Sequence, residues 1–354
     1  MTQESSRPQG SVPTRSGDLD GPSARALWFV ASREARLLTE DVPEPSSDQV
    51  MVRAIVSLVS SGTELTIYRG EGAADQDLGL ETCSGSFGLP VKYAYQVVGE
   101  VVRAGDDAGF RPGDLVFARH PHQELFTMRA DSALISRIPA ELAPERAVFA
   151  NLLDVALNCH LDVPVRHGDC VAVYGQGTVG SLCAQLARRT AAKLAVIDPI
   201  AARRDQAIEW GADAALDPAD AEPGLRDLTA GRGPDISIEA SGSPAALQMA
   251  IRTTGQEGTI AAVSFYGTKQ VPLVLAPEFH VGRQRIISTQ VGTVGSGLQP
   301  RWSLQRRFET VFGLLETSWL RTLVSHEFPF DRAPEAYALL DTRPELASGV
   351  LLRY

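Results

Sequence analysis

The sequence has few of the features that mark membrane-spanning or nucleic-acid-binding proteins. None of its apolar runs approaches the ~20 residues that a transmembrane helix requires. Positive charge is in deficit, because 33 Lys and Arg residues face 43 Asp and Glu residues and give a formal net charge of −10. This balance argues against non-specific binding to nucleic acid or to an anionic membrane. A small-molecule substrate is the expected partner.

Cysteine is also scarce, and the first residues do not have the pattern expected of a signal peptide. The four cysteines show no C-x-x-C spacing, which favours isolated thiols in a reducing cytoplasm over a disulfide framework or a zinc knuckle. The first 24 residues are polar and have no apolar segment of the kind that a signal peptide contains, so we expect 1–24 to be a disordered tail. The remainder is long enough for two domains.

One stretch carries a recognisable binding pattern. A short β-branched run, 171–174, breaks into closely spaced glycines and then enters an Ala- and Leu-rich segment, which predicts strand, tight turn and helix. Gly175 would allow the sharp turn, Gly177 the approach of backbone to a pyrophosphate, and Gly180 the close packing of helix on strand. The free N–H groups at the start of the helix would favour the anion. The predicted cofactor-binding residues of this turn are Gly175, Gly177, Thr178, Val179 and Gly180.

An acidic residue ends the next apolar run. Asp198 lies 18 residues after Gly180, and a carboxylate there can bind both ribose hydroxyls of NAD while it repels the 2′-phosphate of NADP. Arg203 and Arg204 leave two alternatives open, a clamp for that phosphate or an exposed helix face. We therefore predict a dinucleotide site that prefers NAD(H) to NADP, with Asp198 and Arg203 beside the coenzyme.

Strands and helices alternate around this stretch. Strands are expected at 170–174, 194–198, 235–239, 259–265 and 285–289, and helices at 179–189, 201–210 and 244–253. Regular alternation predicts an α/β fold with a doubly wound parallel sheet, the Rossmann architecture. Ligands bind at the carboxyl ends of the strands in such sheets. Ser241, Ser264 and Phe265 are therefore expected near the cofactor.

The earlier part of the chain has a different pattern. Short strands and Gly/Pro turns recur up to about residue 139, which suggests a small barrel-like β domain, and 144–160 turns helical. After residue 297 a helix at 302–316, a strand, a further helix and a last strand are expected to return to that domain. The predicted organisation is a tail at 1–24, a β domain of 25–158 with 297–354, and a nucleotide domain of 159–296.

Six motifs along the chain agree in order and spacing with one family. They are SGTELTIYRG (61–70), VGEVV (98–102), FRPGDLV (110–116), GQGTVG (175–180), WGAD (210–213) and IEASG (238–242). Over about residues 25–354 the chain resembles the medium-chain dehydrogenase/reductase superfamily, the alcohol dehydrogenase-like proteins. This resemblance implies a Rossmann domain inserted into a GroES-like β-barrel catalytic domain, and homodimers joined through the edge of the Rossmann sheet. The first motif is most similar to the branch that contains bacteriochlorophyllide hydroxyethyl dehydrogenase.

The resemblance also implies where a catalytic zinc would bind. The aligned ligand positions hold Ser61, Tyr95, Gln96 and Asn151. These neutral side chains do not supply the three or so N, S or carboxylate ligands that zinc needs, and 118–123 lacks the four cysteines of the family's structural site. We therefore expect no metal. A different site built from Glu64, His120 and His122 is the alternative.

Without zinc, hydrogen-bond donors must stabilise the developing alkoxide. The resemblance implies that the Thr63 hydroxyl starts a proton relay beside the substrate and that the Tyr95 phenol points into the cleft, with Ser61 as a third catalytic candidate. Thr63 could instead satisfy backbone groups in a tight turn, Tyr95 could fill the space of the missing metal, and Ser61 could be polar lining. The residues expected to line the substrate are Gln96, His120, His122 and Asn151, although both histidines could equally be solvated.

These observations support one main interpretation and two alternatives. The main one is a cytoplasmic, zinc-independent, NAD(H)-dependent oxidoreductase that transfers hydride between nicotinamide and a secondary alcohol or ketone. One alternative is an enone or quinone C=C reductase, but such relatives favour NADPH, which Asp198 opposes. The other is a cofactor-binding protein that has lost catalysis. The substrate itself is not identified by the sequence.

Overall fold

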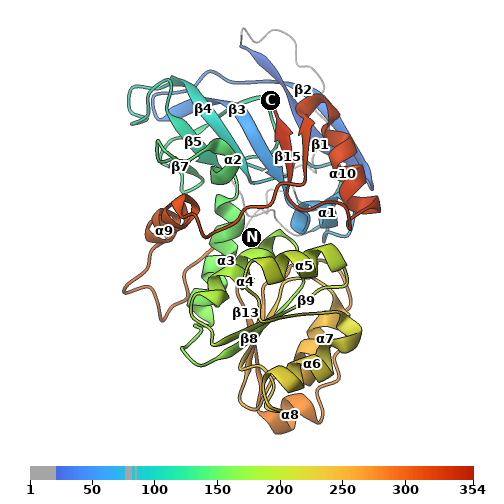
Figure 1. Ribbon diagram of the computed structural model, residues 1–354. Coiled ribbons are helices and arrows are strands. Elements are labelled where there is room, and N and C mark those ends of the chain that lie inside the picture. Colours follow the sequence, from blue (N-terminus) through green and yellow to red (C-terminus); the bar gives the residue numbers. More distant parts are fainter. Residues whose placement is uncertain (1–20, 76–81, 84–85) are drawn as a thin grey trace, which may run out of the picture. The chain divides into compact units, whose positions relative to one another are not determined.

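The computed structural model describes residues 21–75, 82–83 and 86–354, and the chain folds into two compact units (Figure 1). The first unit takes in the described residues up to 149 together with 324–354, and the second consists of 150–323. Among the described residues, none of the helices combines the length and apolarity that crossing a membrane would require.

The second unit is built on a six-stranded parallel sheet with the order β10-β9-β8-β11-β12-β13. Its strands are β8 (Cys170–Tyr174), β9 (Lys193–Ile197), β10 (Ala214–Leu216), β11 (Ile236–Glu239), β12 (Thr259–Ala262) and β13 (Arg285–Ser288). The chain adds β9 and β10 on one side of β8 and then builds β11 to β13 on the other. The strand order therefore reverses between β8 and β11, which opens a crevice at the carboxyl ends of these strands. The predicted doubly wound Rossmann sheet is confirmed.

Helices cover both faces of this sheet, with α4 and α5 on one face and α6 and α7 on the other (Figure 1). The helical segments are α3 (Ala150–Asp162), α4 (Thr178–Arg188), α5 (Ala201–Glu209), η1 (Pro218–Asp220), α6 (Ala221–Leu228), α7 (Pro244–Thr253), α8 (Glu278–Gly282) and α9 (Leu304–Glu316). The sequence pattern missed β10 and α6. The three residues of β10 are only half-buried, and α6 fully buries only Ala221 and Leu225, so neither leaves a readable apolar period.

The first unit is mainly antiparallel β structure. One seven-stranded sheet runs β14-β15-β3-β4-β5-β7 with β6 also paired to β3, and β1 and β2 form a separate hairpin. The strands are β1 (Ser23–Ala31), β2 (Glu34–Asp41), β3 (Gln49–Val59), β4 (Val97–Ala104), β5 (Leu115–Ala118), β6 (Leu125–Arg129), β7 (Ile135–Arg137), β14 (His326–Pro329) and β15 (Val350–Arg353). This is the GroES-like β domain that the sequence predicts, and the chain after residue 324 does return to it.

Short helical segments complete the first unit, and they are α1 (Thr63–Tyr68), α2 (Pro144–Ala147), η2 (Phe330–Arg332) and α10 (Ala333–Thr342). Most of the tail expected at 1–24 lies outside the described residues. Ser23 and Ala24, however, already pair with Asp41 and Glu40 in the first hairpin, so the expected tail extends too far. Ala24 is ordered at the start of β1 because it is buried in a small cluster with Val42 and Met51.

The two units divide at points that differ from the expected boundaries. Most of α3 and all of α9 were expected in the β domain, but both belong to the second unit. Arg307 of α9 is fully buried, and it donates to Asp154 Oδ2 at 3.0 Å and to Asn158 Oδ1 at 2.7 Å, both on α3. This buried ion pair joins α9 to α3, although the two residues are more than a hundred positions apart in the sequence. A local sequence pattern cannot reveal such a contact.

Candidate active site

The turn after β8 is shaped by its three glycines. Gly175 has a φ of 92°, which L side chains rarely adopt, and a Cβ there would lie 2.8 Å from Ser241 Cβ. A Cβ on Gly180 would lie 1.9 Å from the Gly175 carbonyl oxygen, so only glycine lets α4 pack this close to the turn. A Cβ on Gly177 would meet open space, and α4 starts after it with no side-chain cap. The open, uncapped helix N-terminus fits an anionic group such as a pyrophosphate.

The acid after β9 lies against this turn. Asp198 is almost completely buried, and its Oδ2 accepts a hydrogen bond from the Gln176 N–H at 2.7 Å. Its Oδ1 accepts from the Ile200 N–H at 2.8 Å. The carboxylate is therefore fixed on backbone donors at the carboxyl end of β9, and Arg203 Nη1 lies 3.8 Å from Oδ2.

The two arginines of α5 do not form a freely exposed helix face. The side chains of Arg203 and Arg204 are 19% and 20% exposed. Arg204 donates to the Asp198 carbonyl oxygen at 2.7 Å and lies 3.1 Å from Asp217 Oδ2, so its charge is already paired. The exposed-face alternative is wrong, because both guanidinium groups turn back toward acidic residues at the ends of β9 and β10.

The ends of β11 and β12 bring further predicted residues together. The Ser264 Oγ accepts from the Gly242 N–H at 2.8 Å, and the Ser241 Oγ donates to Glu239 Oε1 at 2.5 Å. Phe265 is partly exposed beside them. Glu239 itself, the last residue of β11, is fully buried and was given no role by the sequence pattern.

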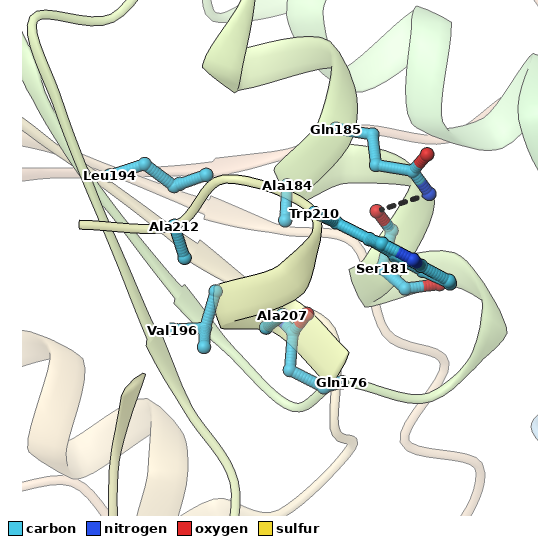
Figure 2. Close-up of a pocket in the computed structure, with 9 residues that line it drawn as sticks. All are labelled: Gln176, Ser181, Ala184, Gln185, Leu194, Val196, Ala207, Trp210 and Ala212. Atoms are coloured by element: carbon cyan, nitrogen blue, oxygen red, sulfur yellow. Dashed lines mark hydrogen bonds between the residues drawn. The ribbon is translucent and has the colours of Figure 1, made fainter. Parts of the chain in front are cut away.

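A small cavity lies behind the turn, but it is not a coenzyme site. Its volume is about 10 Å³, near the lower limit for one water molecule. Figure 2 shows its lining, in which Gln185 Nε2 donates to the Ser181 carbonyl oxygen at 3.3 Å. The lining residues are Gln176, Ser181, Ala184, Gln185, Leu194, Val196, Ala207, Trp210 and Ala212. The cavity is a packing gap among α4, α5 and β9.

In the first unit, one of the three predicted catalytic side chains, Tyr95, has a buried hydrogen-bond partner. The Tyr95 hydroxyl donates to the Ser60 Oγ at 2.7 Å. Burial raises the pKa of Tyr95 to about 12, and the negative charge of Glu64 acts in the same direction. The phenol therefore stays protonated at neutral pH and can donate a hydrogen bond. Ser60 was missed by the sequence analysis, which favoured its exposed neighbour Ser61.

The side chains expected to line the substrate in this unit are deeply buried. Gln96 has no exposed surface, and its Nε2 donates to the Leu58 carbonyl oxygen at 3.2 Å. His120 stacks on Phe126 with ring centroids 3.7 Å apart, and burial lowers the pKa of this histidine to about 3, so its ring is neutral. His122 is 1% exposed. The solvated alternative for both histidines is wrong.

His122 belongs to a buried cluster that joins distant parts of the first unit. Its Nε2 lies 3.2 Å from Glu64 Oε2, and the same oxygen accepts from the Tyr337 hydroxyl of α10 at 2.7 Å. Glu64 Oε1 and His122 Nδ1 have no hydrogen-bond partner among the described residues. Tyr337 lies 273 residues from Glu64 in sequence, so no motif could have predicted this contact. Asn151, the remaining lining candidate, is buried in α3 of the second unit.

The donor set of the first unit does not suit a catalytic zinc ion. The positions expected to hold zinc ligands there offer hydroxyl and amide groups only, whereas zinc takes thiolate, imidazole or carboxylate. The alternative site at Glu64, His120 and His122 is wrong, since among the described residues no three His, Cys, Asp or Glu side chains are arranged to hold a metal. His120 Nδ1 faces the Pro121 carbonyl oxygen at 2.9 Å instead.

A Rossmann sheet with this glycine turn, joined to a GroES-like β unit, defines the class of alcohol dehydrogenase-like proteins. A family model described as zinc-binding dehydrogenase matches residues 178–313, which lie in the second unit. None of the four positions expected to hold zinc ligands falls within this match. D-guloside 3-dehydrogenase of Shigella flexneri is 30% identical over 346 residues, covering 91% of this chain and 97% of the relative. The 2-desacetyl-2-hydroxyethyl bacteriochlorophyllide A dehydrogenase of Cereibacter sphaeroides is 26% identical, covering 92% and 97%.

Solved structures agree on the fold. An alcohol dehydrogenase of Escherichia coli CFT073 complexed with NADH has a TM-score of 0.76 at 17% identity, covering 94% of this chain and all of that one. A zinc-binding dehydrogenase of Sinorhizobium meliloti 1021 bound to NADP has a TM-score of 0.75 at 18% identity, with the same coverage. The chain belongs to the medium-chain dehydrogenase/reductase superfamily, and it is an oxidoreductase of the alcohol/ketone class.

Proposed function

We propose that this enzyme is an NAD(H)-dependent dehydrogenase of secondary alcohols that works without zinc. The observation that carries the coenzyme choice is Asp198, whose carboxylate is fixed by two backbone N–H groups at the carboxyl end of β9. A carboxylate held there can accept hydrogen bonds from ribose hydroxyls and would repel a 2′-phosphate. Arg203, 3.8 Å from Asp198, adds a positive charge that the same carboxylate already balances.

The residues that would hold the coenzyme come from three neighbouring strand ends. Gly177 and the N-terminus of α4 would take the pyrophosphate, and Asp198 the adenosine ribose. Ser241 and Ser264, at the ends of β11 and β12, would lie toward the nicotinamide half. When bound, the nicotinamide ring accepts or returns a hydride.

The chemistry at the substrate oxygen would fall to the first unit. Tyr95 carries a protonated phenol, and its hydroxyl could turn from Ser60 to donate to a ketone oxygen as negative charge develops there. Thr63 would pass the proton in the reverse reaction, with Ser61 as a further hydroxyl. The zinc-independent assignment rests on the chemistry of these donors, none of which is a zinc ligand of the usual kinds.

The relatives support a secondary alcohol as the reacting group. The guloside dehydrogenase is named for oxidation at position 3, and the bacteriochlorophyllide enzyme for a hydroxyethyl group. We propose the same class of substrate here, in a cytoplasmic homodimer. The exposed residues Arg285 and Ser288 lie on β13, which ends the sheet of the second unit and is the edge that a second copy would extend.

A coenzyme and substrate survey tests this function. Purified protein should oxidise a panel of secondary alcohols, including sugar alcohols and glycosides, with NAD+ and far less well with NADP+. Turnover should survive EDTA, and elemental analysis should find well under one zinc per chain. Turnover with enones but not with alcohols or ketones would instead identify a C=C reductase, and tight NADH binding without turnover would identify a protein that has lost catalysis.

A further inference from the structure

The strand order locates the two halves of a bound dinucleotide. Asp198 ends β9, on one side of the reversal between β8 and β11, and the proposed function places the adenosine ribose there. A dinucleotide that crosses the α4 N-terminus must then direct its nicotinamide half to the other side, over the ends of β11 and β12. Neighbouring strands lie about 4.8 Å apart. Groups at the end of β11 are therefore within a few ångströms of that path.

Glu239 ends β11 and is held entirely by neutral donors. Its Oε1 accepts from the Ser241 N–H at 2.7 Å, the Ser241 hydroxyl at 2.5 Å and the Gly242 N–H at 3.0 Å. Its Oε2 accepts from the Tyr266 hydroxyl at 2.6 Å. The residue has no exposed surface, and within the described residues no Lys, Arg or His forms an ion pair with its carboxylate.

This carboxylate also fixes the loops of three strands. Ser241, which it holds, packs so tightly against Gly175 that a Cβ on that glycine would lie 2.9 Å from the Ser241 backbone nitrogen. Gly242, which it also holds, donates to the Ser264 hydroxyl after β12. Burial and the charge of Glu239 together raise the pKa of Tyr266, so its phenol remains a donor to the carboxylate.

A buried anion without a cationic partner acts on any charge that enters its surroundings. The nicotinamide ring carries a positive charge in NAD+ and none in NADH. We propose that Glu239 favours the binding of NAD+ over that of NADH, because its negative charge, which has no ion-pair partner among the described residues, lies near the nicotinamide half of the site. This inference rests on the proposed binding of NAD(H) and adds to it the ratio of the two affinities.

The test compares Glu239→Gln with the wild-type enzyme and with Tyr266→Phe. Glutamine keeps an acceptor oxygen for the loop and removes the charge, whereas Tyr266→Phe keeps the charge and removes one donor. Dissociation constants are measured by calorimetry for NAD+, by fluorescence titration for NADH, and for ADP-ribose, which lacks the nicotinamide. Glu239→Gln should weaken NAD+ relative to NADH by roughly three- to tenfold, with ADP-ribose nearly unchanged. Tyr266→Phe should keep the NAD+/NADH ratio within about twofold of wild type.

A second variant tests whether charge on this loop reaches the nicotinamide half of the site. Lys269 is exposed, and its Nζ lies 3.3 Å from the Gly242 carbonyl oxygen. Lys269→Gln removes a positive charge from the same loop, so it should shift the ratio toward NAD+ by about twofold at low salt. An unchanged ratio in both variants, or an equal loss for NAD+, NADH and ADP-ribose in Glu239→Gln, would overturn the inference. If the wild-type enzyme bound neither coenzyme, the proposed function would fail with it.

Discussion

The two units differ in how their proposed functional groups are specified. In the second unit, the coenzyme pattern consists of backbone requirements: glycine at Gly175 and Gly180 because any side chain would collide, and an acid at a strand end. In the first unit, the proposed catalytic groups are side chains such as that of Tyr95, which is hydrogen-bonded to Ser60 inside the β domain. A backbone requirement admits very few residues. A side-chain role can be taken over by another residue without changing the fold.

This contrast explains how one half can be retained while the other changes. Tyr95 and Gln96 each make a hydrogen bond within the first unit, to the Ser60 Oγ and to the Leu58 carbonyl oxygen, so the β domain accommodates hydroxyl and amide side chains at these positions. Replacing Gly180 would displace α4 from the sheet. Mutations at the proposed coenzyme turn of the second unit should therefore change coenzyme affinity. Mutations of the proposed catalytic side chains of the first unit should change kcat.

The largest effect is expected from Gly180→Ala. Its Cβ would lie 1.9 Å from the Gly175 carbonyl oxygen, so α4 must shift and carry its N-terminus away from the pyrophosphate. NADH affinity should fall by about 100-fold or more. Gly177→Ala is the matched control, since its Cβ meets open space. It should melt like wild type and lose only about tenfold in affinity, by crowding the anion. Fluorescence titration and thermal melting measure both, and wild-type affinity in Gly180→Ala would contradict the assigned turn.

The next effect is expected from Tyr95→Phe, in the other unit. Removal of the phenol takes away the proposed donor to the substrate oxygen, so kcat should fall by about 100-fold. NADH affinity should stay within about twofold of wild type, because Tyr95 lies in the first unit, outside the residues proposed to hold the coenzyme. Ser60→Ala keeps the phenol and removes only its acceptor, and it should lose less kcat. An unchanged kcat in Tyr95→Phe would mean that the tyrosine only fills space.

The same contrast decides how much the sequence could predict. The strands 170–174 and 235–239, and the helix 244–253, agree with the structure within a residue or so, because apolar periods and glycine turns act locally. The sequence analysis missed β10, which has only three residues, and α6, which buries only Ala221 and Leu225. In both, the apolar pattern is too short to detect. The expected domain boundaries differ from the observed ones because Arg307 of α9 pairs with Asp154 of α3 in the second unit. This contact exists only in the folded chain.

The catalytic half was less predictable for a similar reason. The sequence pointed to Tyr95 and Thr63 through motif positions, but the partner of Tyr95 is Ser60, one residue away from the predicted Ser61. The contact of Glu64 with Tyr337 depends on α10 packing beside α1, which is a tertiary event. Burial also decided that both histidine rings lie inside the unit, a point that composition and spacing had left open.

The smallest effect is expected from Asp198, because its proposed role is to discriminate between two coenzymes that would share most of their contacts. Asp198→Ala should reduce the NAD+/NADP+ ratio of kcat/KM by about tenfold. It also leaves the N–H groups of Gln176 and Ile200 without their acceptor, so affinity for both coenzymes should fall. Asp198→Asn separates the two causes, since it keeps an acceptor oxygen and removes only the charge. If both variants kept the wild-type ratio, the choice of NAD would have to come from elsewhere in the second unit, with Arg203 the first residue to examine.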